Sequence, residues 1–347
     1  MDVLFAPDWC NGVPYQLLLA QALAREGMKV KFLAGYKRIL PLSRLLAERD
    51  CDILHLHWPE AYYPRRADGL DWFRRARFTV DLAAALRRCT LVTTAHNLYA
   101  HNRANELFAR RNARITHQQA GVVFAHSTVG AQKLVSTFEL RPEAVRVIPL
   151  GDLSIPLGRP LSRHAALSEL GIRAEKLVLM FGAVEPYKGL EEVIAWWRRG
   201  ASRATLAIVG NPNTDDYAAR IASAIGDSKS IVTEFRWLSN ERLRLWLSTA
   251  DAVLFNYRQV FTSGAAGLTR SWGLPMLLPS RLDTLELDEP TPFVRRFSSF
   301  EKDFAHQLDA ALAVRPDYHA ARSWRERCSW DRVAALTAAG YRSALSS

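Results

Sequence analysis

Short apolar runs and longer amphipathic segments alternate along most of the chain. Each apolar run has the length of a buried strand, and the segments between them have the period of a helix. The strand-length runs are 3–6, 28–34, 53–57, 91–94, 122–125, 145–148, 177–181, 204–209, 231–235, 252–255 and 276–278. The helical segments are 13–26, 40–48, 80–87, 105–117, 129–137, 190–198, 217–225, 241–248, 300–314 and 330–344, with one more that opens at 263–267. This alternation predicts an α/β fold with parallel, doubly wound sheets.

The segment 151–163 interrupts the alternation. It contains Pro156, Gly158 and Pro160 and has no helical period, which is typical of a linker. We therefore expect two doubly wound, Rossmann-like domains that face a deep cleft. Their expected bounds are 1–155 and 165–325, followed by a closing segment 326–347. In such sheets, ligands bind outside the carboxyl ends of the strands.

The composition fits a folded protein of two ordinary domains. Of the 347 residues, 49% are hydrophobic and 23% are charged. No apolar run approaches the roughly 18 residues of a membrane span, and the start of the chain does not resemble a signal peptide. The four cysteines are scattered and form no C-x-x-C pair, which indicates reduced thiols in the cytoplasm.

The chain is strongly basic. Its net charge of +11 and pI near 9.7 indicate a polyanionic partner, which could be nucleic acid, an anionic membrane or a phosphorylated substrate. A basic nucleic-acid-binding protein is therefore one interpretation. The chain contains no recognisable nucleic-acid-binding motif, so we expect no nucleic-acid partner.

The stretch 250–279 predicts an anion site. An apolar strand leads through a polar loop into a helix that Ser263 caps, and Gly264 and Ala265 leave its first backbone N–H groups accessible. Such a helix N-terminus attracts anions, and Arg258 just before it can pair with a phosphate. The alternative is an ordinary capped helix without a ligand.

A second basic turn follows the strand 177–181. Lys188, between that strand and the next helix, can neutralise a diphosphate, although the spacing of a P-loop is absent. The alternative is a solvated loop lysine.

Together these turns resemble the donor domain of GT-B nucleotide-sugar glycosyltransferases. The motifs that carry the resemblance are Gly182 with Lys188-Gly189, Gly210-Asn211-Pro212, Ala250-Asp251, Asn256-Tyr257-Arg258 and Thr262-Ser263-Gly264. The ending Trp330-Asp331-Arg332-Val333 resembles the final helix that crosses back to the first domain in that fold. The candidate donor-binding residues are Gly12, Glu185, Lys188, Asn211, Trp237, Tyr257, Arg258, Thr262, Ser263, Gly264 and Ala265.

Departures from this pattern favour an inverting branch. Retaining members usually carry two glutamates eight positions apart, where this chain has Val260 and Leu268, and Ala183 replaces a basic residue. The motifs Pro7-Asp8-Trp9, Pro14-Tyr15-Gln16 and His55-Leu56-His57-Trp58-Pro59-Glu60 resemble those of bacterial exopolysaccharide β-mannosyltransferases, as in xanthan assembly. The resemblance implies transfer of mannose from GDP-mannose to a polyprenyl-diphosphate-linked oligosaccharide, at the inner face of the cytoplasmic membrane. A UDP-sugar donor, such as UDP-glucose or UDP-glucuronate, is the alternative.

An inverting displacement needs one general base and support for the leaving diphosphate. Glu60, Asp8 and His96 each follow a predicted strand of the first domain. Glu60 is our leading candidate for the base and Asp8 its rival. The alternatives are a capping role for Asp8, a surface ion pair with Arg65 or Arg66 for Glu60, and a core position for His96.

We expect no metal cofactor. The sequence Asp50-Cys51-Asp52 has the form of a metal-binding Asp-x-Asp, but it precedes a strand and so lies at the wrong end of the sheet. Asp215-Asp216 more simply begins a helix, and no other group has the spacing of metal ligands.

The segment 62–77 interleaves basic and aromatic residues. They are Tyr62, Tyr63, Arg65, Arg66, Trp72, Phe73, Arg74, Arg75 and Arg77. This composition suits an anionic lipid surface and a lipid-linked acceptor. The same side chains could stack on single-stranded nucleic acid or form a solvated basic helix.

Overall fold

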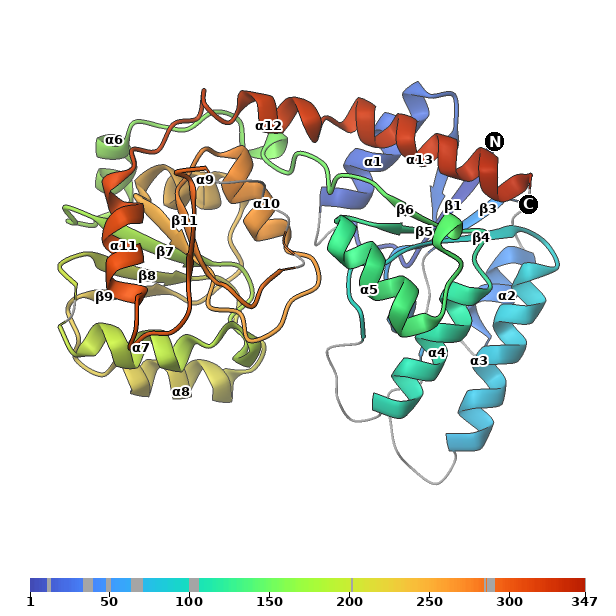
Figure 1. Cartoon of the computed structure of the whole chain (residues 1–347), viewed down its shortest axis with the longest axis horizontal. Helices are drawn as coiled ribbons and strands as arrows, with labels where there is room; N and C mark the ends of the chain where they lie inside the picture. The colour runs from blue at the N-terminus through green and yellow to red at the C-terminus, as the bar shows by residue number, and fades with distance from the viewer. Residues whose placement is uncertain are drawn as a thin grey trace. The chain divides into compact units, whose positions relative to one another are not determined.

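The computed structural model describes residues 1–10, 14–33, 40–47, 51–63, 71–99, 106–200, 202–283, 285 and 291–346. The chain forms two compact units (Figure 1). Unit 1 consists of residues 1–151 and 328–347, and unit 2 consists of residues 152–327.

Unit 1 is built on a parallel sheet of six strands. In chain order these are β1 (Asp2–Ala6), β2 (Lys29–Phe32), β3 (Ile53–Leu56), β4 (Thr90–Thr94), β5 (Val122–Ala125) and β6 (Val145–Val147). Their order across the sheet is β2-β1-β3-β4-β5-β6, so the winding reverses between β1 and β3. The helices are α1 (Pro14–Arg25), α2 (Pro41–Ala47), α3 (Asp71–Leu86), α4 (Glu106–Gln118), α5 (Thr128–Phe138) and α13 (Trp330–Leu345), with short 3-10 turns η1 (Pro59–Tyr62) and η3 (Pro142–Ala144).

The last helix of the chain, α13, completes unit 1. It packs on α1 and on strands β4 and β5. The packing is close, because a Cβ added at Gly340 would lie 2.5 Å from the ring of Phe124. An exposed ion pair of 2.6 Å between Arg25 and Asp331 adds little, since solvent screens it. Apolar packing therefore holds α13 on the sheet.

Unit 2 contains a second parallel sheet of six strands. They are β7 (Leu177–Phe181), β8 (Thr205–Val209), β9 (Ile231–Glu234), β10 (Ala252–Leu254), β11 (Met276–Pro279) and β12 (Val294–Phe297). The order β12-β11-β10-β7-β8-β9 reverses between β7 and β10. The helices are α6 (Arg163–Leu170), α7 (Leu190–Arg198), α8 (Asp215–Ile225), α9 (Asn240–Thr249), α10 (Gly264–Ser271), α11 (Phe304–Ala313) and α12 (Arg322–Arg327), with 3-10 turns η4 (Ile155–Leu157) and η5 (Pro186–Lys188). Buried side chains of α7, α8 and α11 form one core with the sheet.

The structure confirms the predicted α/β class and the two doubly wound sheets, and it corrects several elements. The helix predicted over 80–87 begins at Asp71, because its basic first half hides the apolar period. The predicted linker contains the turn η4, and α6 begins at its end. Strand β12 was not predicted, because Arg295 and Arg296 interrupt its apolar pattern. Arg296 donates to the carbonyl groups of Leu282 and Leu285, which explains how an arginine is accommodated there.

Among the described residues, no helix is long and apolar enough to cross a membrane.

Candidate functional site

The ligand edge of unit 2 lies where the winding of its sheet reverses. Doubly wound sheets bind ligands outside the carboxyl ends of the strands at this point. Here the loops after β7 and β10 meet, because the Arg258 N–H donates to the Tyr187 carbonyl group at 2.7 Å. The buried Asn256 amide donates to the Gly189 carbonyl group at 2.9 Å. These bonds join the two loops into one frame.

Lys188 lies buried in this frame. Its ammonium group donates to the Phe181 carbonyl group at 2.8 Å and lies 5.9 Å from the centre of the Tyr257 ring. Burial lowers the pKa of Lys188 to about 7, although Glu185 acts against this shift. Gly182 leaves the space for the ammonium group, because a Cβ there would lie 3.1 Å from Nζ. The site therefore holds an amine whose charged form an incoming anion would stabilise.

The N-terminus of α10 lies at the end of the same β10 loop. The Ser263 hydroxyl caps the helix by accepting from the Ala266 N–H at 3.2 Å, as predicted. The first N–H groups of a helix have no partner within it and carry its positive dipole end. Gly264 and Ala265 are only partly buried, so these groups suit an anion.

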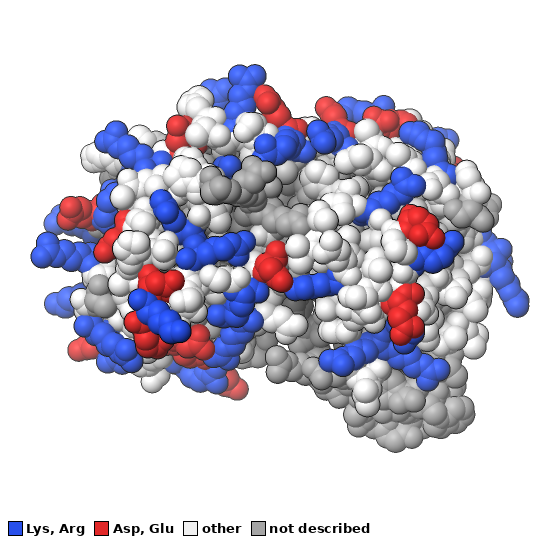
Figure 2. Space-filling model, viewed as in Figure 1, with Lys and Arg blue, Asp and Glu red and all other residues white. Residues whose placement is uncertain are grey.

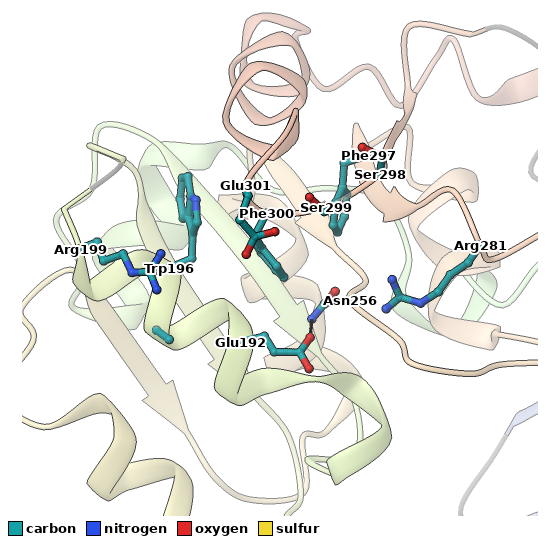
Figure 3. Close-up of a pocket in the computed structure, with 11 residues that line it drawn as sticks. Glu192, Trp196, Arg199, Asn256, Arg281, Phe297, Ser298, Ser299, Phe300 and Glu301 are labelled. Carbon is teal, nitrogen blue, oxygen red and sulfur yellow. Dashed lines mark hydrogen bonds between the residues drawn. The ribbon is translucent and has the colours of Figure 1, made fainter.

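Arg258 and Glu192 form an exposed ion pair of 3.0 Å at this edge. A phosphate contact by Arg258 would therefore require the guanidinium group to exchange its partner. Glu192 also accepts from the Asn256 amide at 3.1 Å, as Figure 3 shows. Glu192 thus connects helix α7 with the β10 loop.

A cavity of about 410 Å³ lies beside Glu192 and Asn256 (Figure 3). Its volume lies within the range of small-molecule sites. Its walls come from α7, the ends of β10 and β11, and the turn between β12 and α11. The lining residues are Glu192, Ala195, Trp196, Arg199, Asn256, Arg281, Phe297, Ser298, Ser299, Phe300 and Glu301.

The loop after β8 lies against the loop after β7. The Val184 N–H donates to the Asn211 carbonyl group at 2.8 Å. Gly210 permits this approach, because its φ is +137° and a Cβ there would lie 2.1 Å from the Gly182 carbonyl oxygen. The exposed Asn211 therefore borders the frame.

The remaining donor-binding candidates have different environments. Tyr257 is buried, Glu185 and Thr262 are partly buried, and Trp237 is 64% exposed. Trp237 follows β9, at the same end of the sheet. Gly12 lies outside the described residues.

In unit 1 the winding reverses between β1 and β3, and Asp8 and Glu60 follow these two strands. The rings of Trp9 and Trp58 lie 4.8 Å apart and connect the two loops. Asp8 is exposed and accepts from the Cys10 N–H at 3.2 Å, a local capping bond. Gln16 entered the sequence analysis only as part of a motif and was assigned no role. Its buried amide donates to the Pro7 carbonyl group and accepts from the Trp9 N–H, which holds the β1 loop in place.

Glu60 lies in the turn η1, directly after β3. Its carboxylate accepts from the Asn97 side-chain amide at 2.7 Å. Asn97 follows β4, the neighbour of β3 in the sheet. Glu60 is only partly buried, so it remains a candidate base at the ligand edge.

His96 belongs to a buried group of imidazoles. His55, His57, His96 and His126 come from β3, β4 and β5 or follow those strands directly, and burial lowers the pKa of all four, so they are neutral at pH 7. His96 stacks on Trp58, with 4.3 Å between the ring centres. His55 has a structural role, because its nitrogens lie 2.6 Å from the Tyr341 hydroxyl and 2.7 Å from the Thr94 hydroxyl.

The predicted membrane segment needs a correction. Tyr62 and Tyr63 are 4% and 7% exposed, and the Tyr63 hydroxyl donates to Thr116. Both rings belong to the core of unit 1 and cannot meet a lipid surface. Arg65 and Arg66 lie outside the described residues, as do the side chains of Trp72, Phe73, Arg74 and Arg75. Arg77 is partly exposed on α3.

Helix α4 presents a basic face that the sequence reasoning missed. Leu107 is 82% exposed, and Arg110 and Arg111 are exposed on the same face, with Arg114 one turn further. The spacing of three, four and seven residues from Leu107 would have revealed it. On the side of the molecule that Figure 2 draws, Lys and Arg are spread among Asp and Glu.

The described residues contain no group of three His, Cys, Asp or Glu side chains that could hold a metal ion.

Comparisons with known proteins agree with this architecture. Residues 12–151 match the sequence model of Glycosyltransferase Family 4. A curated relative from Xanthomonas campestris pv. campestris, GDP-mannose:glycolipid 4-beta-D-mannosyltransferase, is 26% identical over 294 residues. That alignment covers 80% of this chain and 74% of the relative.

Solved structures resemble the whole chain. Anabaena Alr3699/HepE, in complex with UDP and glucose, has a TM-score of 0.71 at 16% identity, covering 98% of both chains. Sucrose-phosphate synthase from Thermosynechococcus elongatus has a TM-score of 0.73 at 14% identity, also covering 98% of both chains. The two six-stranded parallel sheets and these neighbours establish the GT-B fold that the sequence predicts.

Proposed function

We propose that this GT-B glycosyltransferase transfers mannose from GDP-mannose to a lipid-linked oligosaccharide and inverts the anomeric configuration. The observation that carries the proposal is the buried Lys188 ammonium at the point where the sheet of unit 2 reverses. It lies 5.9 Å from the centre of the Tyr257 ring, whose hydroxyl lies 3.4 Å from the hydroxyl of Ser263, the cap of α10. The choice of mannose and of a glycolipid acceptor comes from the activity named for the Xanthomonas relative.

Unit 2 supports the leaving group. When the bond between the anomeric carbon and the diphosphate oxygen breaks, negative charge develops on the diphosphate. The Lys188 ammonium and the amides of Gly264 and Ala265 would stabilise that charge, since they are fixed before the reaction. Removal of water by the bound donor strengthens each of these interactions.

Unit 1 supplies the base. Glu60 takes the proton of the acceptor hydroxyl while the acceptor oxygen forms its bond to the anomeric carbon from the face opposite the diphosphate. Leu268, at one position where retaining members carry a glutamate, is buried and apolar. The absence of an acid there supports a single displacement with inversion.

A lipid-linked acceptor explains the basic face of α4. Leu107 can insert among headgroups while Arg110 and Arg111 attract anionic lipid. We therefore propose that the protein attaches peripherally to the inner face of the cytoplasmic membrane, where a polyprenyl-diphosphate-linked oligosaccharide is accessible.

A thermal-shift panel tests the donor assignment. GDP-mannose, UDP-glucose, UDP-glucuronate, ADP-glucose and a single-stranded oligonucleotide are each added to the full chain, with and without EDTA. Binding at a hundred times Kd stabilises a protein by about 2.7 kcal/mol, so the specific donor raises the melting temperature measurably. We expect GDP-mannose alone to raise the melting temperature, and we expect EDTA to leave that rise unchanged. If only a UDP-sugar raises the melting temperature, the assigned donor is wrong and the UDP-sugar takes its place. If only the oligonucleotide raises it, the assignment as an enzyme is wrong.

A further inference from the structure

We propose that Asn97 is a positioning residue, which orients the Glu60 carboxylate for proton abstraction. The inference rests on the proposed function, because it assigns Asn97 to the same reaction. The observation that supports this role is the 2.7 Å hydrogen bond from the Asn97 side-chain amide to Oε1 of Glu60.

Backbone hydrogen bonds fix the main chain at Glu60. Glu60 lies in η1, where the Ala61 N–H donates to the Trp58 carbonyl group at 3.0 Å and the Tyr63 N–H donates to the Glu60 carbonyl group at 3.2 Å. Ala61 and Tyr63 are buried, and η1 packs on α4. The turn therefore cannot shift without disrupting the core of unit 1.

The position of Asn97 is equally determined by the sheet. Strands β3 and β4 pair in parallel, with Leu56 opposite Thr93, so the residues that follow them emerge side by side. The stack of Trp58 on His96 connects the same two strand ends immediately beside Asn97. The donor amide is thus fixed on an element separate from that of the base.

The space around the pair is restricted. The cavity lined by Glu60, Asn97 and His96 measures about 10 Å³, which is the room of one water molecule at most. The amide has little room for another orientation. The hydrogen bond from the Asn97 amide to Oε1 therefore restricts the rotation of the Glu60 carboxylate.

This arrangement makes a specific chemical prediction. A hydrogen bond to the charged form of a carboxyl group favours that form. Loss of the Asn97 donor should therefore move the acid limb of the rate profile to higher pH, in addition to lowering turnover. If Asn97 only connected the two loops, its substitution would lower the stability of the protein without moving the pH profile of the rate.

The test compares Asn97→Ala and Asn97→Asp with the wild type. Asp keeps the shape of the side chain, but in its ionised form it has no donor and adds a second negative charge beside Glu60. Transfer from GDP-mannose to a synthetic polyprenyl-diphosphate oligosaccharide is followed between pH 5 and 8, and Tm is measured for each variant. Gln21→Ala, an exposed amide on α1 of the same unit, is the matched control.

We expect both Asn97 variants to lower kcat by about ten- to a hundredfold, the cost of a misplaced catalytic group, with an unchanged KM for the donor and the acid limb at higher pH. In a Glu60→Gln background, Asn97→Ala should have no further effect on kcat, because the two residues act as a unit. The Gln21→Ala control should match the wild type.

Two failures can be told apart. If Glu60→Gln retains full activity, the assignment of the base in the proposed function is wrong. If Glu60→Gln is inactive but Asn97→Ala leaves kcat and the pH profile unchanged, or if the two changes multiply in the double variant, the positioning role is wrong while the base assignment stands.

Discussion

Donor affinity should depend on pH through Lys188. Burial lowers its pKa to about 7, so roughly half of the molecules carry a charged ammonium group at pH 7. A bound diphosphate favours the charged form, so binding takes up a proton and affinity falls as pH rises through 7. A charge-assisted hydrogen bond of about 1.5–3 kcal/mol raises the pKa of bound Lys188 by about one to two units, so the affinity should fall by about 7- to 20-fold between pH 6.5 and 8.5.

Isothermal titration with GDP-mannose measures this dependence, because the diphosphate of a sugar nucleotide does not titrate in this window. Lys188→Met should weaken binding on the order of ten- to a hundredfold at pH 6.5, as expected for a lost charge-assisted hydrogen bond. The variant should show a flat pH dependence and approach the wild type at pH 8.5. Lys229→Met, on the exposed surface of unit 2, is the control and should follow the wild type. A wild-type affinity that does not change between pH 6.5 and 8.5, or an equal decline in Lys188→Met, would refute the reasoning.

Two further predictions concern the membrane and the core. Replacing Arg110, Arg111 and Arg114 by Glu should abolish co-sedimentation with anionic vesicles, which in the wild type should weaken at high salt; equal binding of the wild type to neutral vesicles would contradict this. Gly340→Ala should destabilise the protein by about 1–3 kcal/mol in urea unfolding, because the new Cβ would lie 2.5 Å from the ring of Phe124. An unchanged urea midpoint would show that α13 can shift away from the sheet at no cost.

Hydrophobic pattern alone predicted most of the fold. The strand 177–181 and the helix 190–198 have the bounds expected from the sequence, because an uninterrupted apolar run and a strong helical period leave few alternatives. The first half of α3 and strand β12 were missed for the opposite reason. Arginines interrupt the apolar pattern in both segments, and in β12 only the tertiary structure provides partners for Arg296.

The chemistry of the site was predictable only in part. The turns of Lys188 and Ser263 were found because a strand end followed by a small-residue helix start has a local signature. The burial of Lys188 depends on the loop after β10, which is distant from it in sequence. The hydrogen bond between Glu60 and Asn97 requires that β3 and β4 be adjacent. Tyr62 and Tyr63 were misassigned because an aromatic residue in a basic segment looks the same whether it faces lipid or the core.

The stereochemistry of the product tests the central claim most directly. The full chain is incubated with α-linked GDP-mannose and a polyprenyl-diphosphate oligosaccharide, and the anomeric configuration of the transferred sugar is determined by NMR. Our account predicts a β-linked mannose, with turnover reduced by roughly two to four orders of magnitude in Glu60→Gln, the usual contribution of a general base. An α-linked mannose would contradict the single displacement and the role of Glu60 with it.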